Sequence, residues 1–87
     1  MFHVVYVIQS KQDKSFYIGY TSNLKKRISE HNMGLNISTR KQKPWELIFF
    51  EAYLSEKDAR RREKYLKTNQ GSRALKRMLK EFLLLKY

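Results

Sequence analysis

Residues 2–20 read FHVVYVIQSKQDKSFYIGY, two apolar segments separated by a short polar one. The first, Phe2 to Gln9, is an apolar run rich in Val and Ile, which is typical of a buried strand. The second, Phe16 to Tyr20, has the composition of a short aromatic strand. The polar residues between them predict a loop near Ser10–Asp13, so we expect the two strands to form an antiparallel hairpin.

Two tyrosines of this hairpin fall on one face of the predicted sheet. A register that pairs Gln9 with Lys14 places Tyr6 directly opposite Tyr17. Gly19 lies on the same face, and its missing side chain leaves room for another group to approach. A plain aromatic pair in the core is the simpler explanation of the tyrosines, so the hairpin alone does not predict a functional site.

A helix and a third strand are predicted next. One of the polar residues 21–23 can cap the start of the helix, and Gly34 can end it. A polar, basic loop from Leu35 to Lys43 then leads to Pro44. Trp45 to Ala52 follows with the composition of a third strand, whose pairing the sequence leaves open.

Two further helices are predicted in the C-terminal part of the chain. Ser55 is the expected cap of a helix that runs from about Glu56 to Thr68. We expect Gly71 to break the chain and Ser72 to open a last helix. The buried stripe of that helix is predicted at Leu75, Met78, Leu79 and Phe82.

The element order β-β-α-β-α-α predicts an α+β fold with a three-stranded, mainly antiparallel sheet flanked by helices. The 87 residues fit a single domain spanning 1–87. There is no cysteine, which excludes disulfides and thiolate metal sites. No signal-peptide pattern is evident, and no apolar run approaches the ~20 residues that cross a membrane. We therefore expect a cytoplasmic protein without a membrane partner.

Positive charge dominates the composition. The chain has 19 Lys and Arg against 8 Asp and Glu, for a formal net charge of +11. In so small a body this excess is self-repulsive unless a polyanion relieves it. Nucleic acid is the favoured partner, and a solvated surface or an anionic membrane surface is the alternative.

The first predicted helix carries polar residues toward the core. Leu24, Ile28 and Leu35 define its apolar stripe. His31 lies inside this stripe and Arg27 lies on its flank, four residues away on the same face. An arginine extending to solvent beside a hydrogen-bonded, half-buried histidine would explain the pattern without any function.

The second predicted helix repeats this feature with a carboxylate. Glu63 shares one face with Ala59, Arg62 and Leu66, which should meet the sheet. A carboxylate directed inward is costly unless it is paired or binds a metal. The alternative to a metal is an ion pair along the helix with Arg60, Arg62 or Lys67.

Taken together, these residues resemble the GIY-YIG nuclease family, which is named after two segments of its hairpin. Here the segments are Val4-Val5-Tyr6 and Tyr17-Ile18-Gly19. The resemblance covers almost the whole chain and is strongest to small stand-alone members with little beyond the nuclease core. It continues at Thr21, Asn23-Leu24, Arg27, His31, Asn32, Trp45-Glu46-Leu47 and Ala59-Arg60-Arg61-Arg62-Glu63.

Two features depart from the family pattern. The first segment is Val-Val-Tyr rather than Gly-Ile-Tyr, although only its tyrosine has a chemical role. Many members also carry an asparagine on the last helix that supports the site, and Leu75 and its neighbours occupy that region here. The nearest candidate is Asn69, so either Asn69 substitutes or this role is absent.

The resemblance implies a DNA endonuclease with an active site formed by Tyr6, Tyr17, Arg27, His31 and Glu63. Glu63 would bind one Mg²⁺ or Mn²⁺, and Arg27 would contact the scissile phosphate. Tyr6 or Tyr17 would help to activate the attacking water, with Tyr6 slightly favoured, and His31 would orient a tyrosine hydroxyl or bind phosphate. The alternative is a module on the same fold that binds nucleic acid without cutting it.

A basic surface is expected to follow the nucleic-acid backbone without reading its sequence. A targeting partner protein could supply specificity, but no residue identifies one. The predicted backbone contacts are Arg40, Lys41, Lys43, Arg60, Arg61, Lys64, Lys67, Arg73, Lys76 and Arg77.

Overall fold

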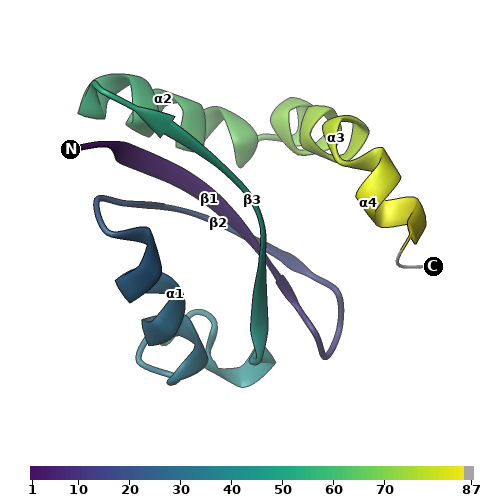
Figure 1. Cartoon of the computed structure of the whole chain (residues 1–87). Coiled ribbons are helices and arrows are strands. Elements are labelled where there is room, and N and C mark those ends of the chain that lie inside the picture. The colour runs from purple at the N-terminus through teal and green to yellow at the C-terminus, as the bar shows by residue number, and fades with distance from the viewer. Residues whose placement is uncertain (86–87) are drawn as a thin grey trace.

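The computed structural model describes residues 1–85 as one sheet with helices on both of its faces (Figure 1). This is the predicted α+β fold, except that the predicted last helix is divided into two helices. A 3-10 helix, η1 (Arg40–Gln42), precedes β3. The main elements are β1 (His3–Ser10), β2 (Phe16–Thr21), α1 (Leu24–Asn32), β3 (Trp45–Tyr53), α2 (Glu56–Leu66), α3 (Asn69–Met78) and α4 (Lys80–Leu85).

The strand order is β2-β1-β3, and β1 pairs antiparallel with both neighbours. Because β1 is central, its residues are buried from Val4 to Ser10, which explains the apolar run in the sequence. Val4, Tyr6 and Ile8 belong to the core on the α1 face. Val5 and Val7 belong to the core on the face covered by α2 and α3. Figure 1 shows α1 on one side of the sheet and α2 and α3 on the other.

The predicted register of the hairpin is wrong by two residues. Gln9 pairs with Phe16 instead of Lys14, so Tyr6 lies opposite Gly19 and Tyr17 lies opposite Ile8. Lys14 has a left-handed φ of 66°, which removes it from the strand and lengthens the loop. A shift of two preserves the alternation of faces, and both tyrosines therefore remain on the α1 face.

Gly19 makes room for the side chain of Tyr6, and the space above it is not open. A Cβ atom at this position would collide with the ring and hydroxyl of Tyr6. The space above Gly19 is therefore filled by the Tyr6 side chain. The glycine allows this side chain to lie across β2, which places its hydroxyl near the edge of the sheet.

The first helix begins and ends near the predicted positions. Asn23 is its cap, and the Asn23 side chain accepts a hydrogen bond from the Lys26 N–H. Gly34 follows the helix with a left-handed φ of 78°. The prediction for Leu35 is wrong, because the helix ends at Asn32 and the Leu35 side chain is 66% exposed.

The prediction that Gly71 breaks the chain and Ser72 opens a helix is also wrong. The preceding helix already ends at Leu66, before the predicted Thr68, and Thr68 instead caps α3 by accepting from the Gly71 N–H. Gly71 lies inside α3, where a Cβ atom would collide with the Tyr65 carbonyl at the end of α2. This glycine therefore serves close packing between two helices rather than a break.

The predicted last helix consists of two helices in the structure. The first ends at Met78 and the second begins at Lys80. Leu75 is buried as predicted, whereas Met78 is 50% exposed, so the prediction that Met78 belongs to the buried stripe is wrong. No helix within residues 1–85 combines the length and the apolar character that a membrane span requires.

Candidate active site

Tyr6 and His31 form the buried centre of the candidate site. The Tyr6 side chain comes from β1 and is 1% exposed, and His31 from α1 is fully buried. The Tyr6 Oη and the His31 Nε2 are hydrogen-bonded at 2.7 Å. On the other side of the ring, the His31 Nδ1 is hydrogen-bonded to the Thr39 Oγ1, also at 2.7 Å. Tyr6, His31 and Thr39 thus form a continuous chain of polar atoms inside the protein.

Thr39 is the member of this chain that the sequence did not reveal. It lies in the loop before β3 and is 1% exposed. Its carbonyl accepts from the Trp45 Nε1 at 2.9 Å, which holds the residue against the core. A single threonine within a polar, basic loop belongs to no periodic pattern of apolar residues, so its burial could not be predicted from the sequence.

The environment of His31 favours its neutral form. Burial and the nearby Arg27 guanidinium lower the pKa of His31, and the weaker effect of Glu30 raises it. A neutral imidazole has one nitrogen that donates and one that accepts. The ring therefore connects the Tyr6 hydroxyl with the Thr39 hydroxyl in a defined direction, and it has a lone pair that can accept a proton.

The second tyrosine, Tyr17 of β2, lies against the same histidine. Its ring centroid is 5.2 Å from that of His31 in an edge-on arrangement and 6.3 Å from that of Trp45. Tyr17 is partly exposed, whereas Tyr6 is buried. The two tyrosines therefore occupy different environments, although both face α1.

Arg27 provides the positive charge of the candidate site. Its Nε donates to the Glu30 Oε1 at 3.1 Å, and its Nη1 donates to the Tyr20 carbonyl at 3.4 Å. Its side chain is 39% exposed, so the guanidinium remains accessible to an anion. Burial raises the pKa of Tyr6 to about 12, with Arg27 acting in the opposite direction and the charges of Tyr17 and Glu63 adding to the rise.

Glu63 comes from α2, the helix on the other face of the sheet from α1. Its side chain is 17% exposed and accepts a hydrogen bond from the Lys67 Nζ at 3.0 Å. Of the three predicted ion-pair alternatives only Lys67 pairs with it, because Arg60 binds Glu56 and Arg62 binds Glu51. Its charge raises the pKa of Tyr6 more weakly than burial and the charge of Tyr17 do, and no hydrogen bond within residues 1–85 joins Glu63 to Tyr6, Tyr17, Arg27 or His31.

The structure thus brings Tyr6, Tyr17, Arg27 and His31 together on the α1 face, whereas Glu63 belongs to α2 and is linked to them only through the effect of its charge on the pKa of Tyr6. Asn69 is not part of this group. It is exposed at the start of α3, and no hydrogen bond within residues 1–85 connects it to the other five residues.

A model of the GIY-YIG catalytic domain matches residues 2–77. The chain belongs to the GIY-YIG family. A UPF0213 protein of Staphylococcus haemolyticus is 39% identical over 75 residues, which cover 85% of this chain and 90% of the relative. The UPF0213 protein YazA of Bacillus subtilis is 41% identical over 66 residues, covering 75% and 66% of the two chains. GIY-YIG is a family of nucleases, so the family relationship supports the expectation of a nucleic-acid partner.

A solved structure supports the same fold for this GIY-YIG chain. The solution NMR structure of a UPF0213 protein of Bacillus halodurans is 32% identical to it, with a TM-score of 0.57. The match covers 90% of this chain and 85% of the solved one.

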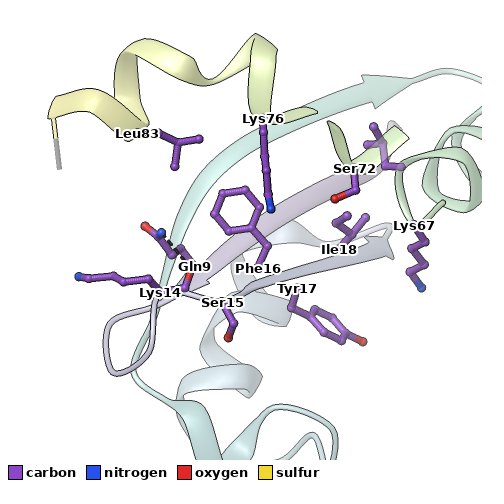
Figure 2. Close-up of a pocket in the computed structure, with 11 residues that line it drawn as sticks. Gln9, Lys14, Ser15, Phe16, Tyr17, Ile18, Lys67, Ser72, Lys76 and Leu83 are labelled. Atoms are coloured by element: carbon purple, nitrogen blue, oxygen red, sulfur yellow. Dashed lines mark hydrogen bonds between the residues drawn. The ribbon is translucent and has the colours of Figure 1, made fainter. Parts of the chain in front are cut away.

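A groove of about 770 Å³ lies beside β2 in this GIY-YIG domain (Figure 2). Lys14, Lys67 and Lys76 line it, and Phe16 and Ile18 contribute its apolar wall. Phe16 and Tyr17 both line it, and Figure 2 shows their side chains pointing in different directions from β2. Because Lys67 also pairs with Glu63, the groove begins next to the candidate site.

The predicted backbone contacts of the GIY-YIG domain fall into three groups. Arg60 pairs with Glu56 and lies 3.7 Å from the centroid of the Tyr20 ring, and Arg61 pairs with Asp58. Neighbouring carboxylates therefore partly neutralise these two arginines. Lys67 and Lys76 line the groove. Besides Lys76, the exposed contacts that form no ion pair within residues 1–85 are Arg40, Lys41, Lys43, Lys64, Arg73 and Arg77.

Proposed function

We propose that this GIY-YIG domain is a divalent-metal-dependent endonuclease that hydrolyses phosphodiester bonds of DNA. The observation that supports the proposal is the buried Tyr6 hydroxyl, which is hydrogen-bonded to a histidine whose pKa is lowered. The pKa of Tyr6 also responds to the opposite charges of Arg27 and Glu63. A core that needed only packing would not bring two charged side chains of opposite sign to a buried phenol.

Glu63 would hold one Mg²⁺ or Mn²⁺. No group of three or more His, Cys, Asp or Glu side chains within residues 1–85 could form a metal cage. A lone carboxylate fits a hard cation that takes its other ligands from water and from phosphate oxygens. The cation would withdraw charge from the phosphate and make the attacking water more acidic. Binding would displace the Lys67 ammonium, which now compensates the charge of Glu63.

The other residues of the site would position the phosphate and remove a proton. Arg27 would contact the scissile phosphate through the part of its guanidinium that solvent reaches, stabilising the charge that develops there. A phenol with a pKa near 12 is a weak base at neutral pH. We therefore assign Tyr6 a relay role, in which it takes a proton from water while its own proton passes to the neutral His31.

The test is a cleavage panel with supercoiled, linear, branched and single-stranded DNA. Cutting is expected with Mg²⁺ or Mn²⁺ and is expected to stop when EDTA removes the metal. Binding without any nicking across the panel would instead support the second candidate, a non-cleaving module. Two observations favour that candidate: Asn69 lies outside the site, and the Glu63 carboxylate is already paired with Lys67.

Affinity for DNA is expected to be largely independent of sequence and to fall steeply with salt. Lysines and arginines that neutralise phosphates release counterions from the DNA. Each such contact therefore makes the affinity fall more steeply as the salt concentration rises. Six such contacts would lower the affinity by about 10³-fold between 50 and 200 mM salt. A titration of labelled duplexes of two unrelated sequences measures this, and an affinity that barely changes with salt contradicts it.

A further inference from the structure

The loop of residues 33–38 exposes three large apolar side chains. Met33 is 59% exposed, Leu35 is 66% exposed and Ile37 is 79% exposed. Single exposed apolar residues are common on protein surfaces and need no explanation. Here, however, three exposed apolar side chains occur at alternate positions of one six-residue loop. Such a cluster of exposed apolar side chains is typical of a surface that contacts another molecule.

The backbone of this loop is well anchored. The Leu35 N–H donates to the Glu30 carbonyl at 3.1 Å, which continues the end of α1. The Asn36 carbonyl accepts from the Thr39 and Arg40 N–H groups at 3.2 and 3.0 Å, and the Asn36 side chain accepts from the Ser38 N–H at 2.9 Å. The apolar side chains therefore project from a backbone whose conformation is fixed by hydrogen bonds. This segment leads directly to Thr39, the hydrogen-bond partner of His31.

The loop lies next to Arg27 of the candidate site and next to two further cations, Arg40 and Lys43. Leu35 lines a hollow of about 380 Å³ together with Arg27, the proposed phosphate contact, and Glu30. A Cβ atom on the neighbouring Gly34 would lie 3.1 Å from the Lys43 Nζ and 3.7 Å from the Arg40 Cβ. Arg40 and Lys43 form no ion pair within residues 1–85, so both charges are available to a phosphate backbone.

We propose that residues 33–38 form an apolar wedge that inserts between stacked bases next to the phosphate bound by Arg27. Cations next to an apolar tip match the chemistry of a duplex, which has phosphates outside and apolar base faces inside. The inference rests on the proposed function and adds to it a preference for one class of DNA substrate. Unstacking costs least at mismatched, nicked or branched positions, so DNA with such a defect is the expected substrate.

The test compares the wild type with a double variant that carries Leu35→Ser and Ile37→Ser. Both side chains are largely exposed, so the fold should tolerate the change. The matched control is Leu54→Ser, because Leu54 is 77% exposed and follows the opposite end of β3. Duplexes with 2-aminopurine beside a mismatch report unstacking as a rise in fluorescence, and EDTA in the buffer prevents cleavage.

The wild type and Leu54→Ser should raise the fluorescence on binding and should prefer the mismatched to the matched duplex. The double variant should show no rise, no preference and roughly tenfold weaker affinity for the mismatched duplex, as expected for removing two apolar side chains from an interface. Equal fluorescence and affinity in the double variant would overturn the wedge. The wedge would also be overturned if the double variant changed only the oligomeric state in sedimentation, which would show that the loop contacts a second copy.

Failure of the wedge can be distinguished from failure of the proposed nuclease. Binding with unstacking but without cutting in Mg²⁺ would support the wedge and contradict the enzyme. Cutting that does not distinguish matched from mismatched DNA would support the enzyme and contradict the wedge. Absence of binding to any duplex would overturn both.

Discussion

Replacing Glu63 by Gln should abolish DNA cleavage while leaving the fold and most of the DNA affinity intact. Gln has nearly the same shape but no negative charge, so it removes the only carboxylate proposed to hold the cation. The expected loss is about 10³-fold or more, in line with the removal of a group that stabilises charge in a transition state. The measurement is the rate of nicking of supercoiled DNA across a Mg²⁺ titration.

Stability should change little in this variant. The ion pair between Glu63 and Lys67 lies on the surface of one helix, and Lys67 is 51% exposed. Such pairs contribute about 0–1 kcal/mol. Glu56→Gln is the matched control, since it removes the neighbouring pair with Arg60 on the same helix without touching the site. Full activity of Glu63→Gln, or cutting that needs no metal, would refute the assigned role of Glu63.

Replacing Tyr6 by Phe should lower the cleavage rate by roughly 10²–10⁴-fold, the usual contribution of a positioned proton-transfer group. It should also destabilise the protein, because the His31 Nε2 loses its 2.7 Å partner in a buried site. A buried polar atom without a partner costs about 1–3 kcal/mol. Single-turnover kinetics and denaturant unfolding measure the two effects separately.

Tyr20→Phe is the control for this prediction. Tyr20 lies on the other face of the sheet, and its hydroxyl is bonded to the His3 Nδ1 at 2.6 Å. Its loss should therefore leave cleavage unchanged. A Tyr17→Phe variant decides between the two tyrosines, and a larger loss of rate there than in Tyr6→Phe would transfer the relay role to Tyr17.

The pH dependence follows from the two pKa shifts in the site. The pKa of His31 is lowered, so cleavage should persist below the ordinary histidine range and fall only when His31 gains a proton. The free energy of unfolding should decrease as the pH falls from the ordinary histidine pKa toward the lowered pKa of His31. In this window the imidazole is protonated in the unfolded chain but still neutral in the folded protein. The pKa of Tyr6 is raised to about 12, so its contribution to stability is complete below pH ~10 and is lost as the pH rises toward 12.

Local patterns predicted the elements well because they depend on neighbouring residues. The run from Val4 to Ile8 is apolar because β1 is the central strand, and that burial is visible in composition alone. The cap at Ser55 and the left-handed Gly34 follow similar local rules. Gly71 was misread because a glycine that permits close packing has the same sequence signal as one that ends a helix.

The candidate site could be predicted only in part. Arg27, His31 and Glu63 were noticed because each is a polar residue directed toward an apolar face, which is a costly arrangement that periodicity detects. Thr39, Lys14 and the exposure of Leu35 were not predicted. Each depends on how a loop folds, and the hydrogen bonds that shape a loop join residues that no period relates.

The sequence by itself determined the strands, the starts of the first two helices, the positive charge and the set of polar residues that the core would have to accommodate. All of these follow from the spacing of side chains along a regular backbone. Tertiary structure alone decided that Tyr6 lies across Gly19, that His31 joins it to Thr39, and that Leu35 faces solvent. The physical reason is that hydrogen-bond partners and exposure depend on the packing of distant segments, which the hairpin register and the loop conformations control.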